Sequence, residues 1–335
     1  MAFTDSLGRP LRDLRISVTD RCNFRCPYCM PKEVFGREWA FLPRREILSF
    51  EEITRLSRLF AGHGVSKIRI TGGEPLLRRD LPRLIAGLVD IEGIREVTLT
   101  TNGSLLGRMA LGLRSAGLTR LTVSLDALED GVFRAMNDVD LPVERVLEGI
   151  SAAAEAGFCP IKINMVVKRG VNEQALPEMA RYCRDGGHVL RCIEYMDVGH
   201  TNGWRLTDVV PASEILAILG SEWPLEAQTP VYFGEVASRY RYRDGGGEIG
   251  IIASVTQPFC RTCTRARMTA DGQLYTCLFA TRGHDLRGLL RGGASDDEIA
   301  ALLSALWHRR TDRYSEQRSA ETVGFRKVEM SRVGG

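Results

Sequence analysis

Apolar and polar side chains alternate along six short segments of the chain, which is the pattern of half-buried strands. These predicted strands are residues 14–19, 67–71, 97–101, 120–125, 161–167 and 189–196. Between them, apolar residues recur at helical spacing over residues 49–62, 78–90, 105–117 and 142–157. The first helix begins with a capping box of Ser49 and Glu52, and the last two end at Gly117 and Gly157, which suits left-handed helix ends. Strands that alternate with helices predict an α/β fold with a parallel sheet, either a barrel or a doubly wound sheet.

Several of the predicted strands carry polar side chains on one of their two faces. The residues on these polar faces are Arg15, Ser17, Thr19, Lys67, Arg69, Thr71, Arg120, Thr122, Ser124, Asp126, Lys162 and Asn164. A closed eight-stranded barrel fills its interior with branched apolar side chains, and a doubly wound sheet has two apolar faces. We therefore expect an incomplete (β/α)6 barrel, similar to a TIM barrel, whose interior holds a polar ligand. The alternative is that these side chains lie at strand ends near solvent.

The pattern changes after about residue 225. Residues 232–255 are typical of an antiparallel pair with a turn at Asp244–Gly247, and residues 267–277 of a hairpin around Asp271–Gly272. Residues 295–310 are typical of an amphipathic helix. We expect the barrel over residues 1–225 and an α+β extension, lying over it, at residues 226–335.

The bulk composition narrows the class of protein. It is 44% hydrophobic and 26% charged, as in ordinary globular proteins. No apolar run is long enough for a membrane span, and the N-terminal segment has no apolar signal core, so we expect a cytoplasmic protein without a membrane partner. A net charge of +3 gives no indication of nucleic acid binding.

Six of the nine cysteines fall into two groups of three. The first triad, Cys22, Cys26 and Cys29, has the spacing C-x3-C-x2-C; the second has the spacing C-x2-C-x13-C and consists of Cys260, Cys263 and Cys277. Disulfides are rare in cytosolic proteins. The scattered Cys159, Cys183 and Cys192 are expected to be buried, inert thiols.

Each triad lacks a fourth cysteine, and this absence indicates the kind of metal centre. A structural zinc site takes four ligands, whereas a [4Fe–4S] cluster held by three thiolates keeps one iron open for a small ligand. We therefore expect two [4Fe–4S] clusters, the second of them in the extension. Zinc with a distant fourth ligand is the alternative, and it has more weight for the second triad because C-x2-C is common in zinc ribbons.

Basic residues are expected to gather in the barrel interior. They are Arg15, Lys67, Arg69, Lys162, Arg191, Arg265 and Arg267. A nearly neutral protein with a cationic cavity predicts an anionic ligand, for example a polyphosphate.

The first triad, with the aromatic Tyr28 before its last cysteine, resembles the radical S-adenosylmethionine (SAM) superfamily. In that superfamily the open iron chelates the amino and carboxylate groups of SAM, and a GGE segment hydrogen-bonds the methionine amino group. The sequence TGGEP at residues 71–75 is similar to this segment. It follows the second predicted strand, at the end of a barrel where active sites lie.

The motifs together resemble the GTP 3′,8-cyclase family of molybdenum cofactor biosynthesis, over essentially the whole chain. They are DLRISVTDRCNFRCPYCMP, KIRITGGEPLLRRDL, LTTNG, VSLDAL, IEYMDVG, CxxCTRAR-x9-C and a terminal Gly334–Gly335. The resemblance implies that SAM yields a 5′-deoxyadenosyl radical that takes hydrogen from C3′ of GTP. Attack on C8 then gives (8S)-3′,8-cyclo-7,8-dihydroguanosine 5′-triphosphate, while the second cluster holds the guanine.

The resemblance also implies roles for individual residues. The six clustered cysteines would bind the two clusters, and the residues that would contact SAM are Tyr28, Gly73, Glu74, Ser124 and Met196. The residues that would contact GTP are Arg15, Lys67, Arg69, Thr100, Lys162, Arg265, Ala266 and Arg267. Arg191 is expected to assist reduction of the cyclised radical, and the Gly-Gly tail to reach into the active site.

The partners implied by the resemblance are GTP as substrate, a second copy of the chain in a homodimer, an electron donor, and cyclic pyranopterin monophosphate synthase as recipient of the product. Two other functions stay open. One is another radical SAM enzyme with an auxiliary cluster, such as a peptide-modifying maturase, although those usually carry more C-terminal cysteines. The other is a zinc-stabilised nucleotide-binding or regulatory protein without catalytic activity, which iron and sulfide analysis would distinguish.

Overall fold

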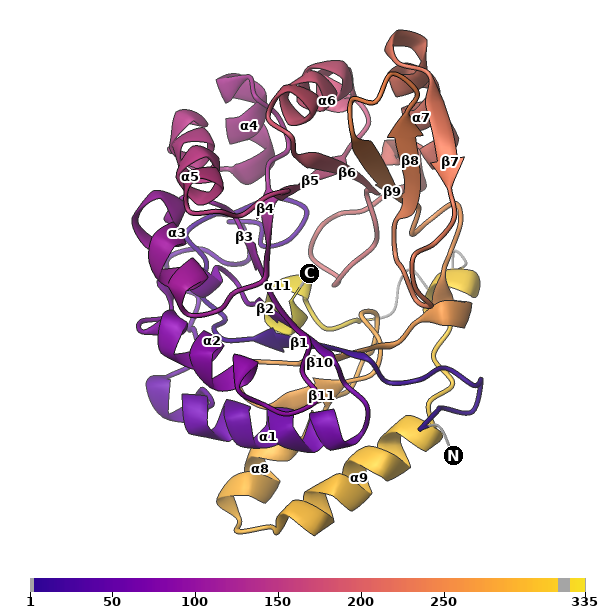
Figure 1. The fold of residues 1–335 in the computed structure, drawn as a ribbon. Coiled ribbons are helices and arrows are strands. Elements are labelled where there is room, and N and C mark those ends of the chain that lie inside the picture. The colour runs from indigo at the N-terminus through magenta and orange to yellow at the C-terminus, as the bar shows by residue number, and fades with distance from the viewer. Residues whose placement is uncertain (1–2, 319–325, 335) are drawn as a thin grey trace.

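A curved parallel sheet forms the centre of the computed structural model, which describes residues 3–318 and 326–334 (Figure 1). Its first six strands are β1 (Asp13–Ser17), β2 (Lys67–Thr71), β3 (Glu96–Thr101), β4 (Arg120–Ser124), β5 (Lys162–Val167) and β6 (Val189–Glu194). They are neighbours in chain order, and every pair is parallel. The six predicted strands and the incomplete (β/α)6 barrel are confirmed.

Helices cover the outer face of this sheet (Figure 1). They are α1 (Phe50–Gly62), α2 (Leu81–Val89), α3 (Leu106–Ser115), α4 (Asp130–Asn137), α5 (Glu144–Glu155) and α6 (Leu176–Asp185). The capping box of α1 is confirmed, since the Ser49 hydroxyl accepts from Glu52 N and Ser49 N donates to the Glu52 carboxylate. Gly117 and Gly157 have φ values of 93° and 88°, as predicted. Helices α4 and α6 were not predicted; α4 has only eight residues, which give about two turns of periodicity.

The alternation along each strand places the core between sheet and helices. Ile68 and Ile70 on β2 and Leu121 and Val123 on β4 are almost completely buried on the outer, helix-covered face. Burial of this apolar surface drives the helices onto the sheet. The polar face of each strand is left to point into the barrel.

Strands beyond residue 225 extend the sheet at both ends. They are β7 (Leu225–Gln228), β8 (Ser238–Tyr242), β9 (Glu248–Ile252), β10 (Arg265–Met268), β11 (Gln273–Tyr275) and β12 (His284–Asp285). The strand order is β12-β11-β10-β1-β2-β3-β4-β5-β6-β9-β8-β7. Both predicted antiparallel pairs, β8 with β9 and β10 with β11, are confirmed. The division into domains at residue 225 stays a prediction.

Further helices of the described residues are α7 (Ala212–Glu222), α8 (Leu286–Arg291), α9 (Asp296–His308) and the short α11 (Met330–Val333). Helix α9 lies beside α1, whereas α11 lies in the middle of the barrel (Figure 1). None of the helices in the described ranges combines the length and apolar character needed to cross a membrane. One prediction about the scattered thiols is wrong: Cys183 and Cys192 are buried, but Cys159 is exposed, because it lies in the turn that leads into β5.

Candidate active site

The polar faces of the barrel strands line a cavity of about 260 Å³. Its lining includes Arg15, Lys67, Arg69, Thr100, Thr122, Ser124, Asp126, Asn164 and Arg191 from the barrel, with Arg265 and Arg267 from β10. The predicted polar interior is therefore confirmed. Among the residues expected to contact ligands or clusters, the cavity lining does not include Cys22, Cys26, Cys29, Gly73, Glu74, Lys162 or Ala266. Ala266 is buried on the opposite face of β10 from its two arginine neighbours.

The cavity is strongly cationic. Burial, together with neighbouring guanidinium groups, lowers the pKa of Arg15, and burial and Arg191 lower the pKa of Arg69 to about 10. Burial and the neighbouring Arg191 likewise lower the pKa of Lys162 to about 7. Cations crowded together in a desolvated site are stabilised by an anionic ligand.

Two of these arginines have donors with no protein partner. Nε and Nη1 of Arg265 and Nε of Arg267 are buried and make no hydrogen bond within the described part of the chain. A buried donor without a partner is costly, so an acceptor from a ligand is expected there. By contrast, Arg69 donates to the Thr100 and Thr122 hydroxyls at 2.9 and 3.2 Å, and the Lys67 ammonium lies 2.9 Å from a Glu96 oxygen.

The loop that carries the first triad packs directly against the GGE segment. Gly73 N donates to Thr19 O and Glu74 N donates to Arg21 O, both at 2.8 Å. A Cβ added to Gly73 would lie 2.3 Å from Arg21 O, so only glycine allows this approach. The two motifs that suggested SAM binding are thus held together, with Cys22 directly after Arg21.

The Glu74 carboxylate points into the protein and not into the cavity. It accepts from Leu76 N, the Thr101 hydroxyl and Asn102 N at 2.7–2.9 Å, and it is 1% exposed. Burial raises its pKa to about 7 despite these bonds. Glu74 therefore ties the ends of β2 and β3 together, and any contact with SAM from this segment falls to the backbone around Gly73.

Tyr28, which comes directly before Cys29 in the chain, lines the cavity together with Ser124 and Met196. The Tyr28 hydroxyl donates to Asp126 Oδ2 at 2.8 Å, and Asp126 Oδ1 accepts from Val166 N at 2.8 Å. These bonds fix the cysteine loop to the ends of β4 and β5. Three of the five predicted SAM contacts thus line the cavity.

The second triad lines the same cavity, together with Arg265 and Arg267. Burial alone would raise the pKa of Cys263, but Arg265 and Arg310 outweigh it and lower the pKa to about 6. Within residues 3–318 and 326–334, no three His, Cys, Asp or Glu side chains surround a point that could hold one metal ion. A cubane takes one thiolate per iron, so its ligands need not converge on one ion as zinc ligands must.

The C-terminal segment enters the barrel beside β2. The exposed fraction of Val333 is 0%, and a Cβ added to Gly334 would lie 2.1 Å from Thr71 Cγ2. Arg332 Nη2 donates to Asp271 Oδ2 at 2.6 Å and anchors the segment to the hairpin between β10 and β11. Gly335, also part of the predicted tail, lies outside the described residues.

Comparison with known proteins matches both halves of the chain. Residues 16–183 match the family described as the Radical SAM superfamily, and residues 188–316 match Molybdenum Cofactor Synthesis C. The GTP 3′,8-cyclase of Acidothermus cellulolyticus is 56% identical over 99% of this chain and 98% of its own. That of Staphylococcus carnosus is 50% identical over 99% of each.

The chain belongs to the GTP 3′,8-cyclase family. The resemblance stated from the sequence is confirmed. As members of the radical SAM superfamily, enzymes of this family use SAM and an iron–sulfur cluster. The loop of the first triad, with the close glycine approach beside it, fits that pair of cofactors.

Solved structures agree on the fold of the cyclase family. The crystal structure of Streptococcus suis SuiB bound to S-adenosylmethionine superposes with a TM-score of 0.62, at 15% identity, over 95% of this chain and 72% of that one. This likeness supports the partial barrel with an extension and nothing beyond the fold.

Some residues that shape the site in this family member were not found from the sequence. The sequence predicts Asp126 on the polar face but gives it no role, and no sequence pattern singles out Arg9 or Arg310. The partner of Asp126 lies 98 residues away, and the contact of Arg310 with Cys263 spans 47 residues. No local pattern signals such contacts; only the fold brings these residues together.

Proposed function

We propose that the protein catalyses the cyclisation of GTP to (8S)-3′,8-cyclo-7,8-dihydroguanosine 5′-triphosphate, the first step of molybdenum cofactor biosynthesis. The observation that carries this proposal is the cationic cavity in which, among the described residues, buried donors of Arg265 and Arg267 have no partner, and whose lining includes the second cysteine triad and Tyr28 from the loop of the first. A triphosphate supplies the acceptors that Arg265 and Arg267 lack. Identity of about half or more with GTP 3′,8-cyclases over nearly the whole chain supports the same substrate.

Two cofactor sites follow from this proposal. Cys22, Cys26 and Cys29 would hold the first [4Fe–4S] cluster, and a second cluster would be held by Cys260, Cys263 and Cys277. When bound, the first cluster and SAM supply the organic radical that removes hydrogen from the substrate. Three thiolates per triad fit a cubane with one open iron.

The residues of the chain bind, orient and shield the reactants. Tyr28, Ser124 and Met196 form the wall for SAM, with the backbone at Gly73 behind it. On the substrate side, the contacts are Arg15, Lys67, Arg69, Thr100, Arg265 and Arg267 from the cavity lining, and Lys162 on β5. Ala266, buried on the opposite face of β10, is not among them. Those cations neutralise the phosphates and fix C3′ of the ribose toward the SAM wall. Arg191, buried beside Arg69, assists reduction of the cyclised product radical.

Further partners are part of the proposal. We expect a cytoplasmic homodimer that takes electrons from a separate donor and passes its product to cyclic pyranopterin monophosphate synthase. The tail enters the site and closes it beside Thr71, which agrees with the buried position of Gly334.

The decisive experiment is an anaerobic assay of reconstituted protein with dithionite, SAM and GTP deuterated at C3′. We expect deuterium in the 5′-deoxyadenosine that forms. If 5′-deoxyadenosine forms without deuterium, the protein is a radical SAM enzyme, but it does not remove hydrogen from C3′ of GTP. If the protein contains zinc and no iron, the hypothesis of a radical SAM enzyme is rejected.

A further inference from the structure

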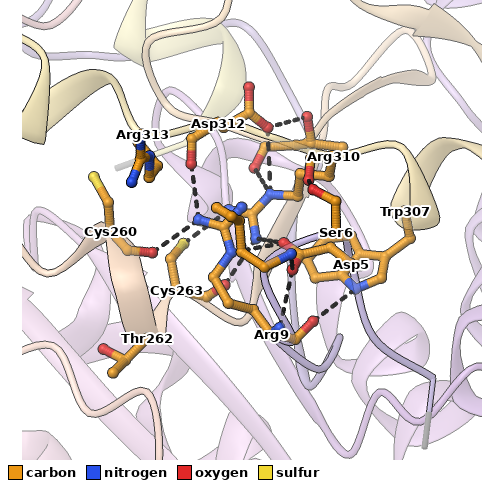
Figure 2. A network of polar contacts seen from close by, with 12 residues as sticks. Asp5, Ser6, Arg9, Cys260, Thr262, Cys263, Trp307, Arg310, Asp312 and Arg313 are labelled. Atoms are coloured by element: carbon orange, nitrogen blue, oxygen red, sulfur yellow. Dashed lines mark hydrogen bonds and ion pairs between the residues drawn. The ribbon is translucent and has the colours of Figure 1, made fainter.

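The second triad is backed by a buried network of charged residues from two distant parts of the chain (Figure 2). One part is the N-terminal turn Asp5–Arg9, and the other is the segment after α9 that carries Arg310 and Asp312. Arg9 and Arg310 are 0% and 4% exposed, so both guanidinium groups are withdrawn from water. Burying such groups is unfavourable unless they are paired, which makes their partners informative.

Arg310 contacts the second triad directly. Its Nη2 donates to Cys263 Sγ at 3.2 Å, and its Nη1 donates to Cys263 O at 2.8 Å. On the far side, Nη1 also donates to Asp5 Oδ2 at 3.1 Å, while Nε donates to Thr276 O at 3.1 Å and to Asp312 Oδ2 at 3.3 Å. Contacts on several sides fix the plane of the guanidinium, so its N–H is held against the sulfur.

Arg9 holds the first cysteine of the same triad. Its Nη1 donates to Cys260 O at 2.8 Å and to Asp312 O at 2.7 Å, and its Nε lies 2.6 Å from Asp5 Oδ2. The Trp307 indole donates to Arg9 O at 3.1 Å. The backbone of the Cys260–Cys263 loop is therefore clamped at two carbonyls by two arginines that share one carboxylate.

The network contains equal numbers of positively and negatively charged side chains. Two arginines are matched by Asp5 and Asp312, and the cation of Arg310 faces the Cys263 sulfur. Removing Arg310 would delete the hydrogen bond to sulfur and leave the network with a net negative charge. Hydrogen bonds to the ligating sulfurs and local charge are two of the factors that set the reduction potential of an iron–sulfur cluster.

We propose that Arg310 is a positioning residue of the second triad, which tunes the cluster bound there by donating a hydrogen bond to the Cys263 sulfur, and that the Asp5–Arg9 turn holds Arg310 in place. This inference rests on the proposed function, because it requires the second triad to hold a cluster. It gives the N-terminal turn a role at a site formed more than 250 residues later in the chain.

The test isolates the second cluster in the full-length chain. Cys22, Cys26 and Cys29 are all changed to Ala, the protein is reconstituted anaerobically, and iron content and reduction potential are measured, the latter by EPR-monitored redox titration. The variants are Arg310→Gln, Arg310→Lys and, as matched control, Arg309→Gln, which removes a charge from the exposed neighbouring position. The parent is expected to hold about four irons per chain.

The outcomes separate this inference from the proposed function. If the parent holds no cubane cluster, the proposed function fails at the second site. If it does, we expect a more negative potential in Arg310→Gln, a smaller shift in Arg310→Lys, which keeps the charge and one donor, and none in Arg309→Gln. A potential in Arg310→Gln equal to that of Arg309→Gln overturns the inference. Should Arg310→Gln fail to fold by circular dichroism, Arg310→Lys decides, and an unchanged potential there overturns it equally.

Discussion

The Tyr28 hydroxyl donates a 2.8 Å hydrogen bond to Asp126 Oδ2, and this bond joins the loop of the first cysteine triad to the end of β4. Burial raises the pKa of Asp126 to about 7, and the bonds from Val166 N and Tyr28 oppose that rise. The Tyr28 hydroxyl therefore stabilises the ionised carboxylate inside the barrel.

Tyr28→Phe should destabilise the protein more at high pH than at low pH. A carboxyl whose folded pKa is raised loses stability as pH rises from its unfolded pKa of about 4 through its folded pKa. The variant raises the folded pKa of Asp126 further, so its extra cost, about 1–3 kcal/mol, is complete only above pH 7. Urea unfolding at pH 6 and pH 8.5 measures the difference.

The control for this variant is Tyr242→Phe. The Tyr242 hydroxyl is buried and has no hydrogen-bond partner among the residues the structure describes. Its removal should leave the free energy of unfolding nearly unchanged at both pH values. An equal loss for Tyr28→Phe at pH 6 and pH 8.5 would contradict the role given to the bond with Asp126.

Lys162 should take up a proton when GTP binds. Burial and the surrounding cations lower its pKa to about 7, so at pH 8 it is largely neutral in the free protein. Bound phosphates favour the ammonium form, and binding then takes up close to one proton. As pH rises above 7, affinity for GTP should fall toward a limit of about tenfold per pH unit.

Calorimetry in two buffers of different ionisation enthalpy counts this proton directly. Lys162→Arg is the matched variant, because a guanidinium keeps its charge at pH 8. The variant should bind GTP with less proton uptake and with a flatter pH dependence. Identical proton uptake in both proteins would show that Lys162 is not the titrating group.

Arg265→Ala combined with Arg267→Ala should weaken GTP binding by about 100-fold or more, since each hydrogen bond to a charged group contributes about 1.5–3 kcal/mol. Nε and Nη1 of Arg265 and Nε of Arg267 have no partner in the described part of the chain, so these donors are available to a ligand. Cleavage of SAM in the absence of GTP should persist. Arg261→Ala, at a side chain that is 85% exposed, is the control and should bind GTP normally.

Local patterns were sufficient for the strands and for most helices of the barrel. Ile68 and Ile70 alternate with Lys67 and Arg69, so a single strand of five residues already defines an apolar face and a polar face. The capping box at Ser49 likewise acts within four residues. Cysteine spacing indicated the two triads in the same way, since each depends on short sequence distances.

Contacts between distant segments could not be predicted. The Glu74 carboxylate points into the protein because it accepts hydrogen bonds from Thr101, the last residue of β3, and from Asn102 after it. A motif alone gives the residue type without the direction of its side chain. Parallel pairing of β9 with β6 and of β10 with β1 depends on how the chain returns after a long connection. The network of Arg9, Asp5 and Arg310 likewise depends on contacts between distant segments, because it forms only when the two ends of the chain meet at the second triad.

Gly334→Ala should expel the C-terminal tail from the barrel. Gly334 has a φ of 74°, which disfavours any other residue, and its added Cβ would lie 2.1 Å from Thr71 Cγ2. Hydrogen exchange should then be at least about tenfold faster at the Val333 amide, which now bonds to Glu329 O. Formation of the cyclised product should fall while the iron content stays the same.

Gly293→Ala is the control for Gly334→Ala, because it introduces backbone strain at a positive φ without a steric clash. Gly293 also has a positive φ, of 86°, but a Cβ there would meet nothing within 4 Å. This variant should lose some stability and keep both slow exchange at Val333 and product formation. Slow exchange at Val333 in Gly334→Ala would mean that Thr71 moves to make room for the new methyl group. The close contact between Gly334 and Thr71 would then not be what holds the tail in the barrel. If exchange accelerates but product formation does not fall, the tail is displaced and the reaction does not need it.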